Sequence, residues 1–194
     1  MASTDRQRWD EKYRRGEHAH REPSELITRL APWLPPSGRA LDLAGGAGRH
    51  AIWLAQHGLD VTLADVSPVA LELAQERAVA AGVSLTPLVV DLETEPFPAG
   101  PWDVILSFHF LWRPLFHEFP RVLAPGGVLM LVQPTISNLQ RHEKPPAPFL
   151  LADGELPELV QGLAMRHYEE GWLHEGRHEA LLVANRPVLG PNSP

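Results

Sequence analysis

The hydrophobic and polar positions of this 194-residue chain follow two alternating periodicities. Short apolar runs that stop at glycine or proline predict buried strands, and stretches with apolar residues three or four positions apart predict helices. The expected strands of the first part of the chain are 39–44, 59–64, 84–90, 102–108 and 127–133. The expected helices are 4–15, 24–33, 47–57, 68–82 and 114–123.

Strands and helices that alternate at this spacing predict right-handed crossovers, and therefore a parallel sheet with helices on both faces. After the proline-rich stretch 145–148 the pattern changes to a short helix over 156–163 and two strands, 165–172 and 178–186, joined through Gly176. Such a pair predicts an antiparallel hairpin. The predicted fold class is α/β, a doubly wound seven-stranded sheet with a parallel core and a C-terminal antiparallel hairpin.

Composition and charge narrow the possible partners. Hydrophobic residues make up 44% of the chain, and Lys+Arg 17 against Asp+Glu 24 gives a net charge of −7. This acidic balance argues against nucleic-acid binding, and no apolar stretch reaches the ~20 residues of a membrane span. The polar first residues do not resemble a signal peptide, so we expect a cytoplasmic protein. The absence of cysteine excludes disulfides, iron–sulfur clusters and thiol-based catalysis.

The segment LDLAGGAGRHA, from Leu41 to Ala51, carries the candidate chemistry. Glycines between a strand and a helix let the backbone turn sharply and approach a ligand closely. The helix that follows directs free N–H groups and the positive end of its dipole at that ligand. The spacing of Gly46, Gly48 and Ala51 also fits the loose fingerprint of dinucleotide-binding folds, which leaves an NAD(P)-dependent reductase as one alternative.

Aspartates at three predicted strand ends favour S-adenosylmethionine (SAM) over NAD(P). Asp42 lies in the turn region, where a carboxylate would repel a pyrophosphate but attract a cationic aminoacyl sulfonium. Asp65 ends the second strand, where it can accept hydrogen bonds from both ribose hydroxyls, and Asp91 ends the third, where it can accept from an adenine amino group. The predicted hairpin also differs from the six-stranded parallel dinucleotide fold.

On these residues the chain resembles a class I SAM-dependent methyltransferase over about residues 39–187. The D-x-G-x-G-x-G element of that family is matched with alanine in place of its first glycine. The resemblance implies a Rossmann-like fold, SAM as the cofactor, and a cofactor site made of Asp42, Ala44, Gly46, Gly48, Asp65, Val66, Asp91, Leu92 and Ser107. The segments WDEKY, GAGRHA and HYEEGW resemble the small tellurite-resistance and thiopurine methyltransferases.

The resemblance also divides the chain. We expect a single methyltransferase domain over 1–194, since this length suits one core. Its parts would be N-terminal helices that can act as a lid (1–36), the SAM-binding core (37–134), a C-terminal helix and hairpin (135–187) and a tail (188–194).

The methyl acceptor is expected to be a small molecule. In-line methyl transfer depends mainly on proximity and orientation. A soft or anionic acceptor, such as a thiol or a selenium or tellurium oxyanion, is expected to need no base when it is already ionised, as a thiolate is, whereas a hydroxyl or amine needs one. The candidate bases are His109 and His142. The expected pocket walls are Tyr13, His109, Trp112, Arg113 and the 145–150 loop.

Structural roles are alternatives for several of these residues. His109 lies among aromatic residues and could be a packed histidine, and Tyr13 could simply pack on Trp9. His18 and His20 have the spacing of a metal pair, but histidines in a polar loop are more often solvated, and no metal is predicted. A SAM-binding regulator without an acceptor pocket is the second functional alternative, because no catalytic base is assigned.

Overall fold

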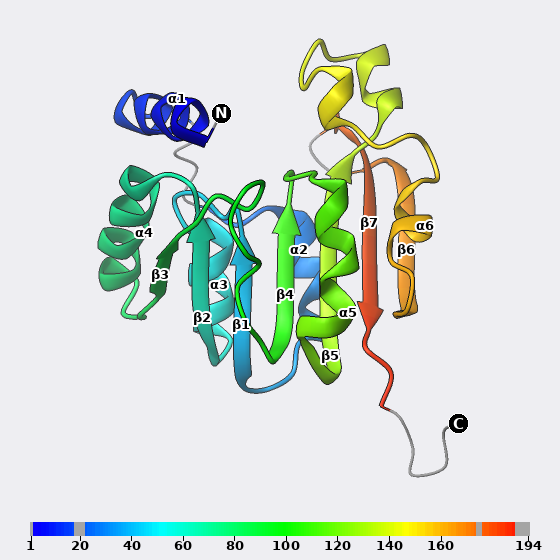
Figure 1. Cartoon of the computed structure of the whole chain (residues 1–194), viewed down its shortest axis with the longest axis horizontal. Helices are drawn as coiled ribbons and strands as arrows, with labels where there is room; N and C mark the ends of the chain where they lie inside the picture. Colours follow the sequence, from blue (N-terminus) through cyan, green and yellow to red (C-terminus); the bar gives the residue numbers. More distant parts are fainter. Residues whose placement is uncertain (1, 18–21, 174–175, 189–194) are drawn as a thin grey trace.

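A computed structural model describes residues 2–17, 22–173 and 176–188. Its seven strands form one sheet in the order β3-β2-β1-β4-β5-β7-β6 (Figure 1). The strands are β1 (Gly38–Leu43), β2 (Leu59–Asp65), β3 (Thr86–Val89), β4 (Trp102–Phe108), β5 (Leu123–Pro134), β6 (Ala164–Trp172) and β7 (His178–Asn185). Neighbours from β3 to β5 pair in parallel, whereas β7 is antiparallel to both β5 and β6. The predicted fold class is confirmed, including the antiparallel hairpin.

The helices lie close to their predicted positions. They are α1 (Ala2–Arg14), α2 (Glu25–Leu30), α3 (Arg49–Gln56), α4 (Pro68–Ala80), α5 (Phe119–Val122) and α6 (Leu156–Leu159), with short 3-10 helices η1 (Ala31–Trp33), η2 (Arg113–His117), η3 (Ile136–Gln140) and η4 (Ala147–Phe149). The Ser67 hydroxyl caps α4 by accepting from the Ala70 N–H at 3.1 Å. The prediction of one helix over 114–123 was wrong, since Pro114 and Pro120 divide it into η2 and α5.

Alternation along the strands places neighbouring residues on opposite faces of the sheet. On one face, Ala40, Leu106 and Val183 belong to the apolar cluster that packs on α2 and α3. Their neighbours in sequence belong to a second cluster, which packs on η2, α5 and α6. By the same alternation Asp42, Phe108 and Glu179 project to the α2/α3 face, at the end of the sheet where the parallel strands finish.

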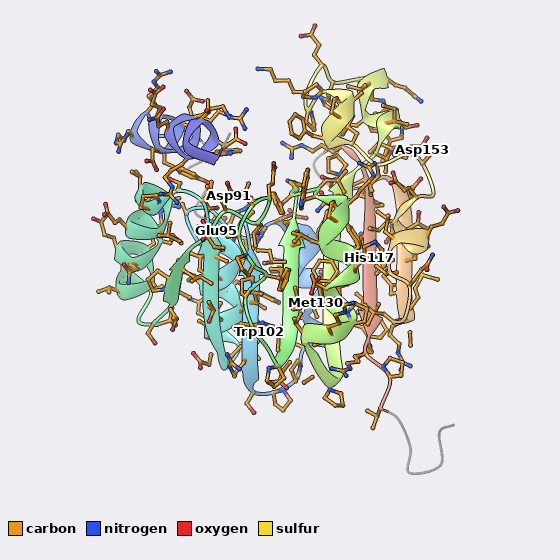
Figure 2. The ribbon with its side chains drawn as sticks, in the orientation of Figure 1. Asp91, Glu95, Trp102, His117, Met130 and Asp153 are labelled. Atoms are coloured by element: carbon orange, nitrogen blue, oxygen red, sulfur yellow. The ribbon has the colours of Figure 1, made fainter. Side chains whose placement is uncertain are left out.

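The carboxyl ends of the parallel strands meet at the upper edge of the sheet in Figure 1. Helix α1 lies above this edge on one side, and the segment 136–149 lies above it on the other. Asp91 and Glu95 are near this edge, whereas Trp102 is at the opposite end (Figure 2). In the described parts of the chain, no helix is long and apolar enough to cross a membrane.

Candidate functional site

The turn between β1 and α3 uses left-handed backbone at three positions. The φ angles are 51° at Ala44, 57° at Gly46 and 77° at Gly48. Glycine adopts this conformation without steric cost, whereas an L-residue with a Cβ loses about 1–2 kcal/mol there. Alanine at the position of the family's first glycine is therefore strained and not neutral.

Close approaches explain the middle glycines of this turn. A Cβ at Gly46 would lie 2.1 Å from the Tyr13 hydroxyl, and one at Gly45 would lie 2.4 Å from Asp42 Oδ2. The backbone therefore runs directly beneath α1 and directly beside the carboxyl of Asp42. A Cβ at Gly45 would displace the buried carboxyl of Asp42, and one at Gly46 would displace the hydroxyl end of Tyr13.

Asp42 is a buried acid of the site whose carboxyl oxygens lack hydrogen-bond partners among the described residues. Its residue is only 1% exposed, and among the described residues neither carboxyl oxygen accepts a well-formed hydrogen bond. Burial, with a further contribution from Asp65, raises its pKa to about 8, although Arg49 and the Ala51 N–H oppose the shift. A buried carboxyl without a partner gains most from a cation placed beside it.

Asp65 and Asp91 are buried at the ends of β2 and β3. The oxygens of Asp65 accept from the N–H groups of Gly46 and Ser67, each at 2.9 Å. Burial raises the pKa of Asp65, against the lowering effect of these N–H groups. Asp91 Oδ1 accepts from the Glu93 N–H at 3.0 Å. A carboxylate has about four lone-pair positions, so each aspartate retains acceptor capacity for a ligand.

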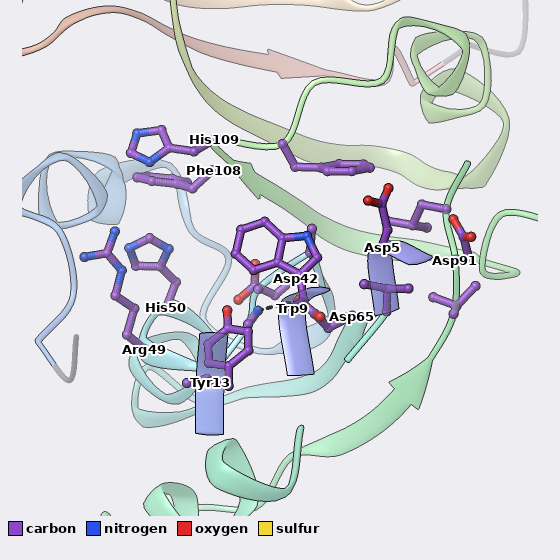
Figure 3. Close-up of a pocket in the computed structure, with 18 of the residues that line it drawn as sticks. Asp5, Trp9, Tyr13, Asp42, Arg49, His50, Asp65, Asp91, Phe108 and His109 are labelled. Atoms are coloured by element: carbon purple, nitrogen blue, oxygen red, sulfur yellow. Dashed lines mark hydrogen bonds between the residues drawn. The ribbon is translucent and has the colours of Figure 1, made fainter. Parts of the chain in front are cut away.

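These groups surround a cavity of about 230 Å³ (Figure 3). Of the sequence-predicted residues, it brings together Tyr13, Asp42, Ala44, Gly46, Asp65, Val66, Asp91, Leu92 and His109. Gly48, Ser107, Trp112 and Arg113 are not among the residues that line it. Lining residues that sequence reasoning missed include Asp5, Trp9, Arg49, His50, Glu93 and Phe108.

Helix α1 forms one wall of the cavity through residues four positions apart, Asp5, Trp9 and Tyr13. It is attached to the β2–α4 connection, because Arg6 Nε donates to the Val66 carbonyl at 3.2 Å and the Ser67 hydroxyl donates to Asp10 Oδ1 at 2.5 Å. Burial, and then the Asp65 charge, raises the pKa of Tyr13, so its hydroxyl stays protonated. Residues four positions apart lie on one face of a helix, so this spacing is the sequence signal by which Asp5 and Trp9 could have been found together with Tyr13.

On the opposite side of the cavity, His109 follows β4 directly. Its φ of 59° is left-handed, and its N–H donates to the Val132 carbonyl at 2.9 Å. Its Nε2 lies 2.7 Å from Oε1 of Glu179, whose side chain is 2% exposed on β7. His109 is therefore not merely packed among aromatic rings. No local sequence signal joins residues so far apart along the chain.

Three of the residues expected at the acceptor site, Trp112, Arg113 and His142, do not line the cavity. Arg113 is paired with Glu155, with Nη2 2.7 Å from Oε2, and also donates to the Leu150 carbonyl at 3.1 Å. His142 Nε2 lies 2.8 Å from the Gly176 carbonyl oxygen, outside the cavity. Trp112 lines a neighbouring groove that shares Leu92 and Glu93 with the cavity. His18 and His20 lie outside the described residues, as do residues 189–194 of the predicted tail.

A second group of titratable side chains lies away from the cavity. Ligand-type atoms of Asp153, Glu170 and His178 lie within 4.8 Å of one another. Each has a hydrogen-bond partner nearby: the Ser137 hydroxyl donates to Asp153 at 2.5 Å, the Gly154 N–H donates to Glu170 at 3.0 Å, and Thr135 Oγ1 lies 2.7 Å from His178 Nδ1. These contacts account for the cluster without a metal ion.

Comparison with known proteins shows which families and folds this chain resembles. Residues 40–127 match the family described as a methyltransferase domain. Over 102 residues the chain is 36% identical to a demethylmenaquinone methyltransferase of Thermus thermophilus, covering 49% of this chain and 46% of the relative. It is also 29% identical over 170 residues to a SAM-dependent Diels–Alderase of Talaromyces variabilis, covering 79% of this chain and 55% of the relative. The chain thus spans about half the length of these curated relatives.

Solved structures share the whole fold. TehB from Haemophilus influenzae superposes with a TM-score of 0.73 at 21% identity, covering 91% of this chain and 67% of that one. A TehB-like SAM-dependent methyltransferase from Corynebacterium glutamicum superposes with a TM-score of 0.63 at 20% identity, covering 95% and 97%. The fold is the one seen in these solved structures. The match of residues 40–127 to the methyltransferase-domain family, together with the shared fold, confirms the predicted resemblance to class I SAM-dependent methyltransferases.

Proposed function

We propose that this protein transfers the methyl group of SAM to a small-molecule acceptor. The observation that carries the proposal is the unpaired, buried carboxyl of Asp42 beside a glycine turn that leaves no room for a Cβ. A carboxyl in this position suits a cationic ligand and disfavours a pyrophosphate, which separates SAM from NAD(P).

The residues of the cavity fit SAM. When bound, SAM supplies a methyl group activated by attachment to a positively charged sulfur. Asp42 would face the cationic part of the cofactor, Asp65 would accept from the ribose hydroxyls, and Asp91 would accept from the adenine amino group. Val66 and Leu92 supply apolar surface between these two acids. Helix α1 would exclude water from one side through Trp9 and Tyr13.

For the acceptor we propose a soft or anionic nucleophile. Arg113 was an expected pocket residue that would have supplied positive charge, but Glu155 pairs with its guanidinium, and Arg113 does not line the cavity. Arg177 lies beside His109 instead, with Nη1 3.5 Å from Nδ1 of that histidine, although it does not line the cavity itself. A cation there would favour an acceptor that carries or develops negative charge. The relatives differ in the reactions that their names state, so they support SAM more than any one acceptor.

Ligand binding tests the cofactor and turnover tests the reaction. At about 100 Kd, S-adenosylhomocysteine should add roughly 2.7 kcal/mol to the unfolding free energy, a rise of about 5–10 °C in Tm for a chain of this size. A shift with NADP but with neither sulfur nucleoside would contradict the proposal. SAM is then incubated with a library of thiols, phenols, amines and oxyanions. Binding without turnover on any acceptor would favour a SAM-binding regulator.

A further inference from the structure

Glu179 occupies a position that would otherwise hold an apolar residue. It lies at the start of β7 and continues the row of Leu181 and Val183, which pack into the same apolar cluster as Phe108. A carboxylate at 2% exposure is costly unless it is hydrogen-bonded. The partner is His109, whose Nε2 lies 2.7 Å from Glu179 Oε1.

The two charged neighbours of His109 determine which ring nitrogen carries the proton. A carboxylate can only accept, so the nitrogen facing Glu179 is Nε2–H. A guanidinium can only donate, so Nδ1, which lies 3.5 Å from Arg177 Nη1, is the accepting nitrogen, and an acceptor X–H would take the place of this long contact. The neutral imidazole is therefore held with Nδ1 as its accepting atom.

The backbone strain at His109 and the state of the neighbouring histidine both support a functional role for the His109 imidazole. Ala44 and His109 are the only residues other than glycine with positive φ among those the structure describes. Such strain is kept where the surrounding structure overrides it, often at functional sites. The other titratable ring nearby is His50, which packs on Phe108 at 4.3 Å between ring centroids. Burial lowers the pKa of His50 and the Ser24 N–H donates to its Nε2, so His50 stays neutral.

We propose that His109 is the catalytic base for the methyl acceptor and that Glu179 is its positioning residue. The proposal rests on the proposed methyl transfer and narrows its acceptor class to molecules with an ionisable X–H group. A small thiol satisfies this condition and is also soft. The oxyanions that need no base are then excluded.

The proton and electron balance is simple. The acceptor X–H gives its proton to His109 Nδ1, and the electron pair left on X forms the new bond to the methyl carbon. The bond between that carbon and sulfur breaks with its pair remaining on sulfur, so the sulfonium becomes a neutral thioether. Glu179 stabilises the imidazolium that results, in the way that a buried carboxylate supports a catalytic histidine. The imidazolium then releases its proton to water.

Two measurements test the proposal in the full-length protein. In ligand-free protein, the ring 15N signals of His109 should show Nε2–H, and Glu179→Gln should weaken that preference, because an amide can donate as well as accept. In single-turnover transfer from SAM to 2-mercaptoethanol or 4-cresol near neutral pH, His109→Ala should reduce the rate by about 100-fold or more, the size of a general-base contribution. Glu179→Gln should reduce it by about tenfold or more. His117→Ala, at an exposed histidine of η2, is the matched control.

The pH dependence and the double variant separate positioning from a structural defect. The deficit on the thiol should shrink at high pH, where the thiol ionises without a base. The double variant should be no slower than His109→Ala alone. Rates of His109→Ala within threefold of wild type, transfer only to iodide or thiocyanate, or no transfer to any probe while SAM binds would each overturn the inference. Failure of SAM itself to bind would instead overturn the proposed function.

Discussion

Proton release on SAM binding follows from the raised pKa of Asp42, which burial moves to about 8. In the ligand-free protein near neutral pH this carboxyl is mostly protonated, whereas a cation beside it favours the ionised form. When the pH is one unit below this pKa, Asp42 is ionised in roughly a tenth of the molecules. The apparent Kd for SAM should then be about tenfold weaker than at high pH. One pH unit lower, it should be about 100-fold weaker.

Calorimetry measures this coupling directly. SAM is titrated at several pH values in phosphate and in Tris, whose different ionisation enthalpies report the protons released. We expect close to one proton per SAM well below pH 8 and a gradual loss of release above it. Asp42→Asn should bind SAM more weakly at high pH and without pH dependence. A wild-type Kd that is flat from pH 6 to 8, with no proton release, would refute the reasoning.

The same pKa predicts an effect on stability. An unfolded aspartate titrates at 3.8 and folded Asp42 at about 8. Between these values the folded state binds the extra proton, so the unfolding free energy falls as pH rises and levels off above about 8. Relative to wild type, Asp42→Asn should gain up to about 4 kcal/mol between pH 5 and pH 8, at ~1.36 kcal/mol per unit. Asp60→Asn, at an exposed acid of β2, should show no such trend.

Three further predictions concern the walls of the cavity. Ala44→Gly should raise the Tm by about 2–4 °C, because relief of left-handed strain outweighs the entropy of the added glycine by roughly 1 kcal/mol; a lower Tm would contradict the strain argument. Asp65→Ala should weaken SAM binding by about tenfold or more and also lower the Tm, since the N–H groups of Gly46 and Ser67 lose their acceptors. An unchanged Kd in calorimetry would leave Asp65 with a structural role only. Tyr13→Ala should speed SAM dissociation in stopped-flow measurements, and an unchanged off-rate would mean that α1 does not cover the ligand.

Sequence pattern predicted the sheet well because its signals are local. The buried runs of β1, β2, β4 and β5 stop at glycine or at polar residues, and the cap of α4 is a short-range hydrogen bond. The aspartates at strand ends were placed correctly for the same reason, since parallel strands bring their carboxyl ends to one edge. Where local signals conflicted, the prediction failed, as with the prolines within 114–123.

Side-chain partners between distant elements could not be predicted in this way. Arg113 follows β4 closely enough to suggest the pocket, but Glu155, far along the chain, binds its guanidinium. Glu179 lies in a strand whose pattern is otherwise apolar, and only the antiparallel pairing of β7 with β5 brings it to His109. Such contacts depend on the register of two strands, which composition and periodicity leave undefined.

Three features that destabilise the folded state lie at the same edge of the sheet. The unpaired carboxyl of Asp42 and the left-handed backbone of Ala44 and His109 all lie where the parallel strands end, whereas the middle residues of β1 and β4, such as Ala40, Leu41 and Ile105, are buried and apolar. Strained backbone and unpaired polar groups destabilise the folded state, and proteins retain them mainly at functional sites. An unpaired carboxyl can bind a ligand, whereas a carboxyl that is already paired within the protein cannot do so as well. Substitutions that remove these features should therefore separate stability from binding. Asp42→Asn should make the free protein more stable while SAM binds less well.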